Sequence, residues 1–161
     1  MKIQEFLLPE LHQEVALTET FLKRIPQDKL DWRPHQKSMT MGELANHLAE
    51  LPSWVTATME LDELEMNEYK PQVFKKVNEI VEALKNNANE AEASLQKPDE
   101  EYFKNWKMLY NGEILMEKNK LETLRSVVMN QFPHHRAQLG VYFRLLDVPV
   151  PATYGPSADE Q

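Results

Sequence analysis

Residues 121–146, LETLRSVVMNQFPHHRAQLGVYFRLL, form the stretch of this sequence that decides the fold. Positions three or four apart share one face of a helix, and here that face is apolar at both ends and polar in the middle. It is made of Leu121, Leu124, Val128, Gln131, His135, Leu139, Tyr142 and Leu146. The pattern predicts a helix from about residue 119 to 146 that faces a core and carries Gln131 and His135 toward it.

A second core-facing pattern is interrupted in the same way. Its face is made of Leu44, His47, Leu48, Leu51 and Val55. A buried imidazole must find a partner, because leaving it unpaired costs a few kcal/mol. The interruptions therefore indicate that two helices meet around a shared polar object, for which a metal ion is the simplest candidate.

Two interpretations of His47, Gln131 and His135 are open at this point. Neutral imidazole binds zinc, nickel, copper or iron, and three protein ligands with an open position form the catalytic kind of metal site. An amide oxygen such as that of Gln131 is a poor ligand for these metals. In the alternative interpretation, the three side chains hydrogen-bond one another across the core.

The polar neighbours of these residues have simpler interpretations. Glu50, three residues after His47, either orients that imidazole or lies solvated on the helix face. His134 points about 100° away from His135 around the helix and is expected at the surface. Arg136 and Gln138 are expected to make structural hydrogen bonds.

Composition excludes several classes of protein. The net charge is −8 and the basic residues are dispersed, which argues against a nucleic-acid partner. No apolar run approaches the ~20 residues that span a bilayer, so no membrane partner is expected. The absence of cysteine excludes thiolate ligands and disulfides and favours a cytoplasmic location. With four glycines, the chain offers no glycine-rich phosphate loop.

The first half of the chain predicts two helices. One runs from about residue 3 to 24 and is followed by a long connector over residues 25–38. The next begins with a capping box, in which Thr40 and Glu43 exchange side-chain-to-backbone hydrogen bonds, and continues to about Leu61. Pro52 lies inside it, so a kink or break is expected near residues 48–51.

The second half predicts two more helices with a turn segment between them. The third helix is expected to follow Pro71 and to end before Pro98. Asn111-Gly112, between apolar flanks, favours a small hairpin over a plain turn. In the last helix, Pro133 must free the carbonyl of Met129. The expected fold is all-α: residues 1–161 form a single domain, a four-helix bundle with a long connection after helix 1 and a small hairpin or turn segment before helix 4.

Two segments resemble the DinB-like superfamily, which includes YfiT-type metal-dependent enzymes. They are WRPHQKSMTMGELANH, residues 32–47, and NQFPHHRAQLGVYFRLLDVPVP, residues 130–151. In that family, one histidine of the second helix and an Asn-His-x-x-x-His-Arg pattern of the last helix form a three-histidine site for a divalent metal. The resemblance implies His47 and His135 as ligands of a nickel or zinc ion, with Gln131 at the middle histidine position. The three-histidine site is therefore incomplete in this chain.

The resemblance also implies a reaction class. Relatives include thiol S-transferases and an isomerase, in which the metal activates a thiol or a water. The expectation is a metal-dependent enzyme of the thiol S-transferase or hydrolase type that acts on a small molecule, with a low-molecular-weight thiol as a further partner. The alternative is a non-catalytic binding or stress-related protein that kept the fold and lost the metal site.

Apolar residues outside the main core faces add an expectation about assembly. Relatives of this fold commonly form homodimers, and extra apolar side chains on a helix often mark an interface. Here they are Phe6, Leu8, Leu17 and Phe21 on the first helix and Val73 and Ile80 around the third. The chain is therefore expected to form a homodimer.

Overall fold

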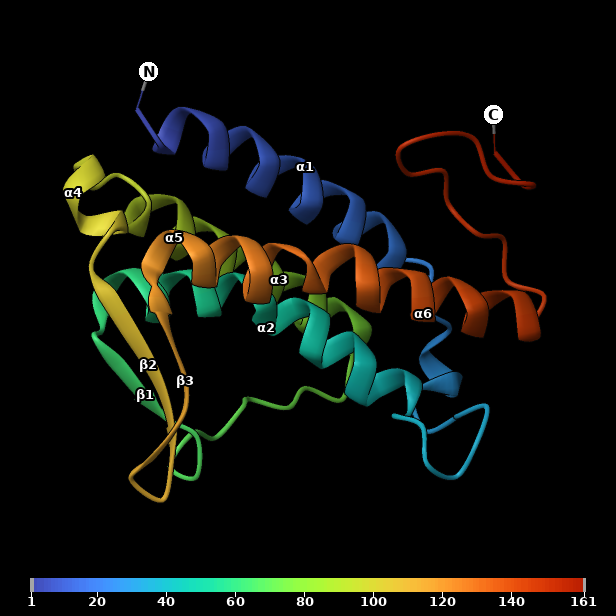
Figure 1. The fold of residues 1–161 in the computed structure, drawn as a ribbon. Helices are drawn as coiled ribbons and strands as arrows, with labels where there is room; N and C mark the ends of the chain where they lie inside the picture. The colour runs from blue at the N-terminus through green and yellow to red at the C-terminus, as the bar shows by residue number, and fades with distance from the viewer. Residues whose placement is uncertain (1, 161) are drawn as a thin grey trace.

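The computed structural model describes residues 2–160 as a mostly helical chain with a small sheet beside the helices (Figure 1). The long helices are α1 (Gln4–Leu22), α2 (Met41–Glu60), α3 (Val77–Ser94) and α6 (Gln131–Leu145). The short ones are the 3-10 helix η1 (Gln27–Lys29), α4 (Asp99–Tyr102) and α5 (Lys120–Thr123). The strands are β1 (Glu63–Glu65), β2 (Asn105–Tyr110) and β3 (Glu113–Asn119). No helix within residues 2–160 combines the length and the apolar character needed to cross a bilayer.

The long helices pack in a ring around one core. α1 and α2 each contact both α3 and α6, and leucines such as Leu11, Leu48 and Leu139 are completely buried between them. The predicted helical class is confirmed. The all-α prediction with four helices is incomplete, because the chain also forms a three-stranded sheet and several short helical segments.

The start of α2 is as predicted. The hydroxyl of Thr40 accepts from the amide of Glu43 at 3.1 Å, and the Glu43 carboxylate accepts from the amide of Thr40 at 2.7 Å. The predicted break before Pro52 is absent, because α2 runs continuously through this buried proline. Packing against α3 on one side and α6 on the other holds the helix across the missing hydrogen bond.

The third helix begins at Val77, six residues after Pro71, rather than directly after that proline as predicted. The cause is a side chain of α2. Asn46 accepts from the amide of Phe74 at 2.8 Å and donates to its carbonyl at 3.0 Å, as a neighbouring strand would. These bonds hold the segment outside a helix, and the amide of Val77 then donates to the Gln27 side chain at 2.9 Å.

The last helix is not one regular α-helix. α5 leads into a π-helical segment, Leu124–Met129, and α6 follows after Asn130; Figure 1 shows them running on in one direction. Pro133 has no N–H to donate to the carbonyl of Met129, as predicted. The wider π turns precede this point, so the irregularity extends over two turns rather than one residue.

The predicted hairpin is present and is joined by an unpredicted strand. Asn111 and Gly112 both adopt positive φ, 50° and 77°, as a tight two-residue turn between twisted strands requires. β1 pairs with β2 in parallel. The carboxylate of Glu65, at its end, accepts from the amides of Asn111 and Gly112 at 3.0 and 2.8 Å. β1 thereby fixes the hairpin against the end of α2.

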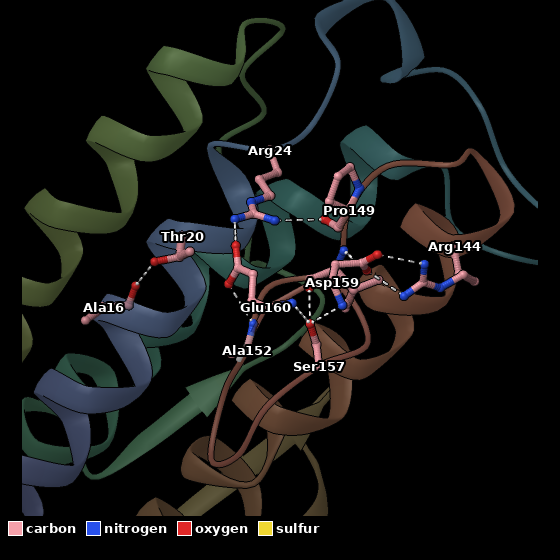
Figure 2. A network of polar contacts seen from close by, with 10 residues as sticks. Ala16, Thr20, Arg24, Arg144, Pro149, Ala152, Ser157, Asp159 and Glu160 are labelled. Carbon is pink, nitrogen blue, oxygen red and sulfur yellow. Dashed lines mark hydrogen bonds and ion pairs between the residues drawn. The ribbon is translucent and has the colours of Figure 1, made fainter.

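The C-terminal tail folds back over α1 and α6. Val148 and Val150 pack against the core, and a compact turn follows (Figure 2). Asp159 accepts from Arg144 at 2.6 Å and from the amide of Val150 at 2.8 Å. Glu160 accepts from the amide of Ala152 at 3.0 Å and pairs with Arg24 of the segment after α1. Two carboxylates therefore tie the end of the chain to both helices.

We predict that acid releases this tail. The pKa of Asp159 is lowered by hydrogen bonds from Arg144 and Val150, and that of Glu160 by bonds from Ala152 and Arg24. A lowered folded-state pKa means that the stabilisation is present above the unfolded pKa of about 4 and is lost as the pH falls through the folded value. The NMR shifts of the Val150 and Ala152 amides should move together toward random-coil values in acid.

In Asp159→Asn the Val150 amide should already be released at neutral pH and should titrate no further. If that amide keeps its native shift in the variant, or in the wild-type protein in strong acid, the carboxylates do not hold the tail.

Candidate metal centre

The structure brings His47 of α2 and His135 of α6 into direct contact. Their ring centroids are 4.5 Å apart and their planes meet edge to face, at 84°. His135 is buried and the side chain of His47 is 28 % exposed. Two residues 88 positions apart in the sequence thus meet because α2 and α6 pack along the core-facing stripes that both contain a histidine.

Each ring is oriented by a residue of its own helix. Nδ1 of His47 lies 3.2 Å from a carboxylate oxygen of Glu50, and Nδ1 of His135 lies 2.9 Å from the amide oxygen of Gln138. The amide nitrogen of Gln138 lies 3.3 Å from Nε2 of His134, which fits this orientation of the amide. The network assigns the proton of both rings to Nδ1 and leaves both Nε2 atoms as acceptors.

Burial keeps His135 in the neutral form. Desolvation lowers its pKa, and the neighbouring His47 and His134 lower it further, against an opposing effect of the hydrogen bond to Gln138. A neutral imidazole with a free Nε2 is the form that binds a metal ion.

Glu50 is itself held in place. It accepts from the hydroxyl of Tyr69, a residue of the connector after β1, and its side chain is 13 % exposed. Burial and the Glu50 carboxylate raise the pKa of Tyr69, so this phenol stays protonated and donates. A chain of contacts therefore runs from Tyr69 through Glu50 to His47, and the solvated alternative for Glu50 is wrong.

Gln131 lies beside His47 but outside this network. Both line a pocket of about 170 Å³, together with Leu51, Trp54, Met108, Val127 and Val128. His135 instead lines a second pocket, of about 450 Å³, with Lys37, Ser38, Met39, Gln138, Val141 and Tyr142. Among residues 2–160, no hydrogen bond joins Gln131 to either histidine, so the alternative of mutual hydrogen bonds across the core is wrong.

The donor set fits a metal ion only in part. Within the described residues, no group of three or more His, Cys, Asp or Glu side chains is placed to hold a metal. Two imidazoles are of the right kind for nickel or zinc, and Gln131, which shares a pocket with His47, offers only a weak amide oxygen. Among the described residues, the set of good ligands therefore stops at two imidazoles.

His134 and Arg136 lie as the sequence predicted, and two histidines far from the site are also at the surface. His134, His12 and His35 are exposed. Arg136 has a structural role: it is 1 % exposed, and its guanidinium donates to Glu14 of α1 at 2.7 Å and to the hydroxyl of Tyr154 at 2.5 Å. Glu14, Tyr154 and Tyr69 carry no sequence pattern that marks them, because their partners are distant in the chain.

Comparison with known proteins places this geometry in a family. The model of the DinB family matches residues 3–161. The chain belongs to the DinB family. No curated protein matches it.

Solved structures of DinB-like proteins have the same fold. A DinB-like protein from Bacillus cereus is 20 % identical, with a TM-score of 0.72 over 95 % of this chain and 98 % of its own. One from Bacillus subtilis is 17 % identical, with a TM-score of 0.68 over 96 % and 98 %. A candidate DinB family member from Exiguobacterium sibiricum is 19 % identical, with a TM-score of 0.70 over 94 % and 97 %. At these identities the similarity establishes the fold, and it confirms the predicted resemblance.

We predict that metal-free protein resists protonation at His135. Because burial lowers the folded-state pKa below about 6.5, the unfolded chain binds the proton more readily, and stability falls as the pH drops through this range. Long-range ¹H–¹⁵N NMR of the His135 ring should show Nδ1 protonated and Nε2 bare down to a pH below about 6.5, the ordinary value for a histidine. A midpoint for His135 at or above about 6.5 would contradict the prediction.

Proposed function

We propose that this DinB family chain is a metal-dependent enzyme of the thiol S-transferase or hydrolase type. Nε2 of His47 and Nε2 of His135 would be the ligands of a nickel or zinc ion, with Gln131 as a weak third donor. The observation that carries the proposal is the contact of two histidines, His47 with Nδ1 toward Glu50 and His135 with Nδ1 toward Gln138. Metal-binding histidines are typically oriented in this way, through the other ring nitrogen.

A divalent cation in such a site supplies acidity, since it lowers the pKa of a bound thiol or water and so provides a nucleophile near neutral pH. The protein's own residues would do the rest. Glu50 and Tyr69 hold the His47 ring, and Gln138 holds the His135 ring. The substrate would be a small molecule, with a low-molecular-weight thiol as co-substrate, and the protein would act in the cytoplasm.

One observation favours a second candidate function. Gln131 stands where the family pattern has a histidine, and residues 2–160 contain no acidic, cysteine or histidine side chain that completes a set of three ligands. A chain of this kind would be a non-catalytic binding or stress-related protein that retained the fold.

We predict that Gln131→His strengthens metal binding, because imidazole replaces a weak amide donor. Calorimetric titration with Ni²⁺ or Zn²⁺ should give weak binding to the wild-type protein and binding at least about tenfold tighter to the variant. A chelator should lower the melting temperature of the metal-loaded variant more than that of the wild-type protein.

Gln96→His, the same change at an exposed residue after α3, is the matched control and should leave the affinity unchanged. Equal affinity in wild type and Gln131→His would remove Gln131 from the ligand set. Absence of binding in the wild-type protein alone, with strong binding in Gln131→His, would favour the non-catalytic function.

We further propose that the chain forms a two-fold homodimer. Two of the apolar residues from which the sequence predicted it do not support the proposal. Ile80 and Phe21 are buried in the chain's own core, so they are not available to a partner. Phe6 and Val73 are 64 % and 69 % exposed. Light scattering at micromolar concentration should give the dimer mass, and the double variant Phe6→Ser, Val73→Ser should shift it toward the monomer; a wild-type monomer would contradict the proposal.

A further inference from the structure

The pocket that His47 and Gln131 share is otherwise apolar. It is open on one side and is lined by α2, the strand β2, the π-helical segment before α6, and the first residue of α6. Its apolar lining is Leu51, Trp54, Met108, Val127 and Val128. No charged residue lines it, and its volume is about 170 Å³. His47 and Gln131 supply the polar atoms of the lining, so the pocket has one polar side and an apolar remainder.

The helical wall of this pocket is an irregular one. Val127 and Val128 belong to the π-helical segment Leu124–Met129. π turns are rare and are frequently found at functional sites. Pro133 accounts for the free carbonyl of Met129 but not for a π segment that begins at Leu124.

The strand beside the pocket pairs irregularly as well. Met108 of β2 pairs with Met116 and Leu109 with Ile114, so Leu115 of β3 is the extra residue of a bulge. Met108 lines the pocket and lies opposite this bulge, and bulges are frequent next to active sites. The pocket is therefore lined by a π-helical segment on one side and, on another, by a strand whose partner is bulged.

The wall from α2 contains an unpaired polar atom. Nε1 of Trp54 is buried without a hydrogen-bond partner among the described residues, although the ring packs at 5.5 Å from Tyr69. A buried unpaired N–H costs stability. The Trp54 side chain lines the pocket with apolar ring atoms, and its buried Nε1 adds no accessible polar atom to the lining.

We propose that this pocket is the binding subsite for a short uncharged apolar chain or ring of the substrate, whose polar end lies at His47 and Gln131. The volume sets the scale, since a cavity of about 150 Å³ with an apolar lining holds benzene. The subsite would hold about six carbon atoms against its apolar walls, and the rest of a longer chain would extend through its open side. The placement of the polar end rests on the proposed function; the apolar subsite does not.

Benzene tests the subsite without any metal. In the presence of EDTA, benzene should shift the methyl NMR signals of Leu51 and Val128 in a saturable way. Val127→Phe, which fills the pocket, should weaken this binding about tenfold or more. Leu145→Phe also introduces a phenyl ring, at an exposed position of α6 outside the pocket, and should bind benzene as the wild-type protein does.

A variant that enlarges the pocket covers the case in which Val127→Phe does not fold. Val127→Ala should bind p-xylene more tightly than the wild-type protein does. Absence of a benzene shift in the wild-type protein overturns the proposal, as does benzene affinity that neither Val127→Phe nor Val127→Ala changes.

A series of alkyl hydroxamates in the presence of Ni²⁺ tests the polar end. Affinity should rise with chain length to about six carbons and then level off, and Val127→Ala should move the point of levelling to a longer chain. Benzene binding without any Ni²⁺-dependent hydroxamate binding would leave the subsite standing and overturn the metal centre. Hydroxamate binding that does not vary with chain length would overturn the subsite and leave the metal centre standing.

Discussion

The edge-to-face contact between His47 and His135 is the interaction on which the rest of this structure depends. Imidazoles cannot be left unpaired in a core, and here neither ring uses the other as its hydrogen-bond partner, since each turns its Nδ1 to a residue of its own helix. α2 and α6 can therefore pack closely at this level while two ring nitrogens stay available. The polar contacts of the two histidines therefore stay within their own helices, through Glu50 on α2 and Gln138 on α6.

On α2, two residues close to His47 in the sequence hold the connector that follows β1. Asn46 holds the backbone at Phe74, and Glu50 receives the hydroxyl of Tyr69, so the connector between β1 and α3 is fixed on both sides of His47. On α6 the residue after His135 has the equivalent role. Arg136 is almost completely buried, paired with Glu14 of α1 and with Tyr154 of the tail. Breaking one partner of a buried ion pair leaves an uncompensated charge, so this pair fixes the rotation of α6 and with it the direction of the His135 ring.

The sequence predicts the parts of the fold that local patterns control. The helical stripes, the capping box at Thr40 and the turn at Asn111-Gly112 depend on residues within a few positions of one another, and all are present. The errors concern long-range partners. β1 is only three residues long and exists because β2 lies beside it, and α3 begins late because Asn46 holds Phe74. For the site, periodicity placed His47 and His135 on facing stripes. Periodicity did not indicate Tyr69, because this residue lies in an irregular segment and reaches the site only through its hydrogen bond to Glu50.

Gln131 has an electrostatic consequence as well as a chemical one. The pKa of His135 is already lowered by the neighbouring His47 and His134, because a second positive charge near a first is unfavourable. A third imidazole at position 131 would add another group that cannot be protonated cheaply, and only a bound cation would compensate for it. An amide avoids this cost, since it is neutral at every pH and both donates and accepts. Gln131 therefore adds no titratable group beside His47, and it lines, with that histidine, a pocket whose other lining residues are apolar.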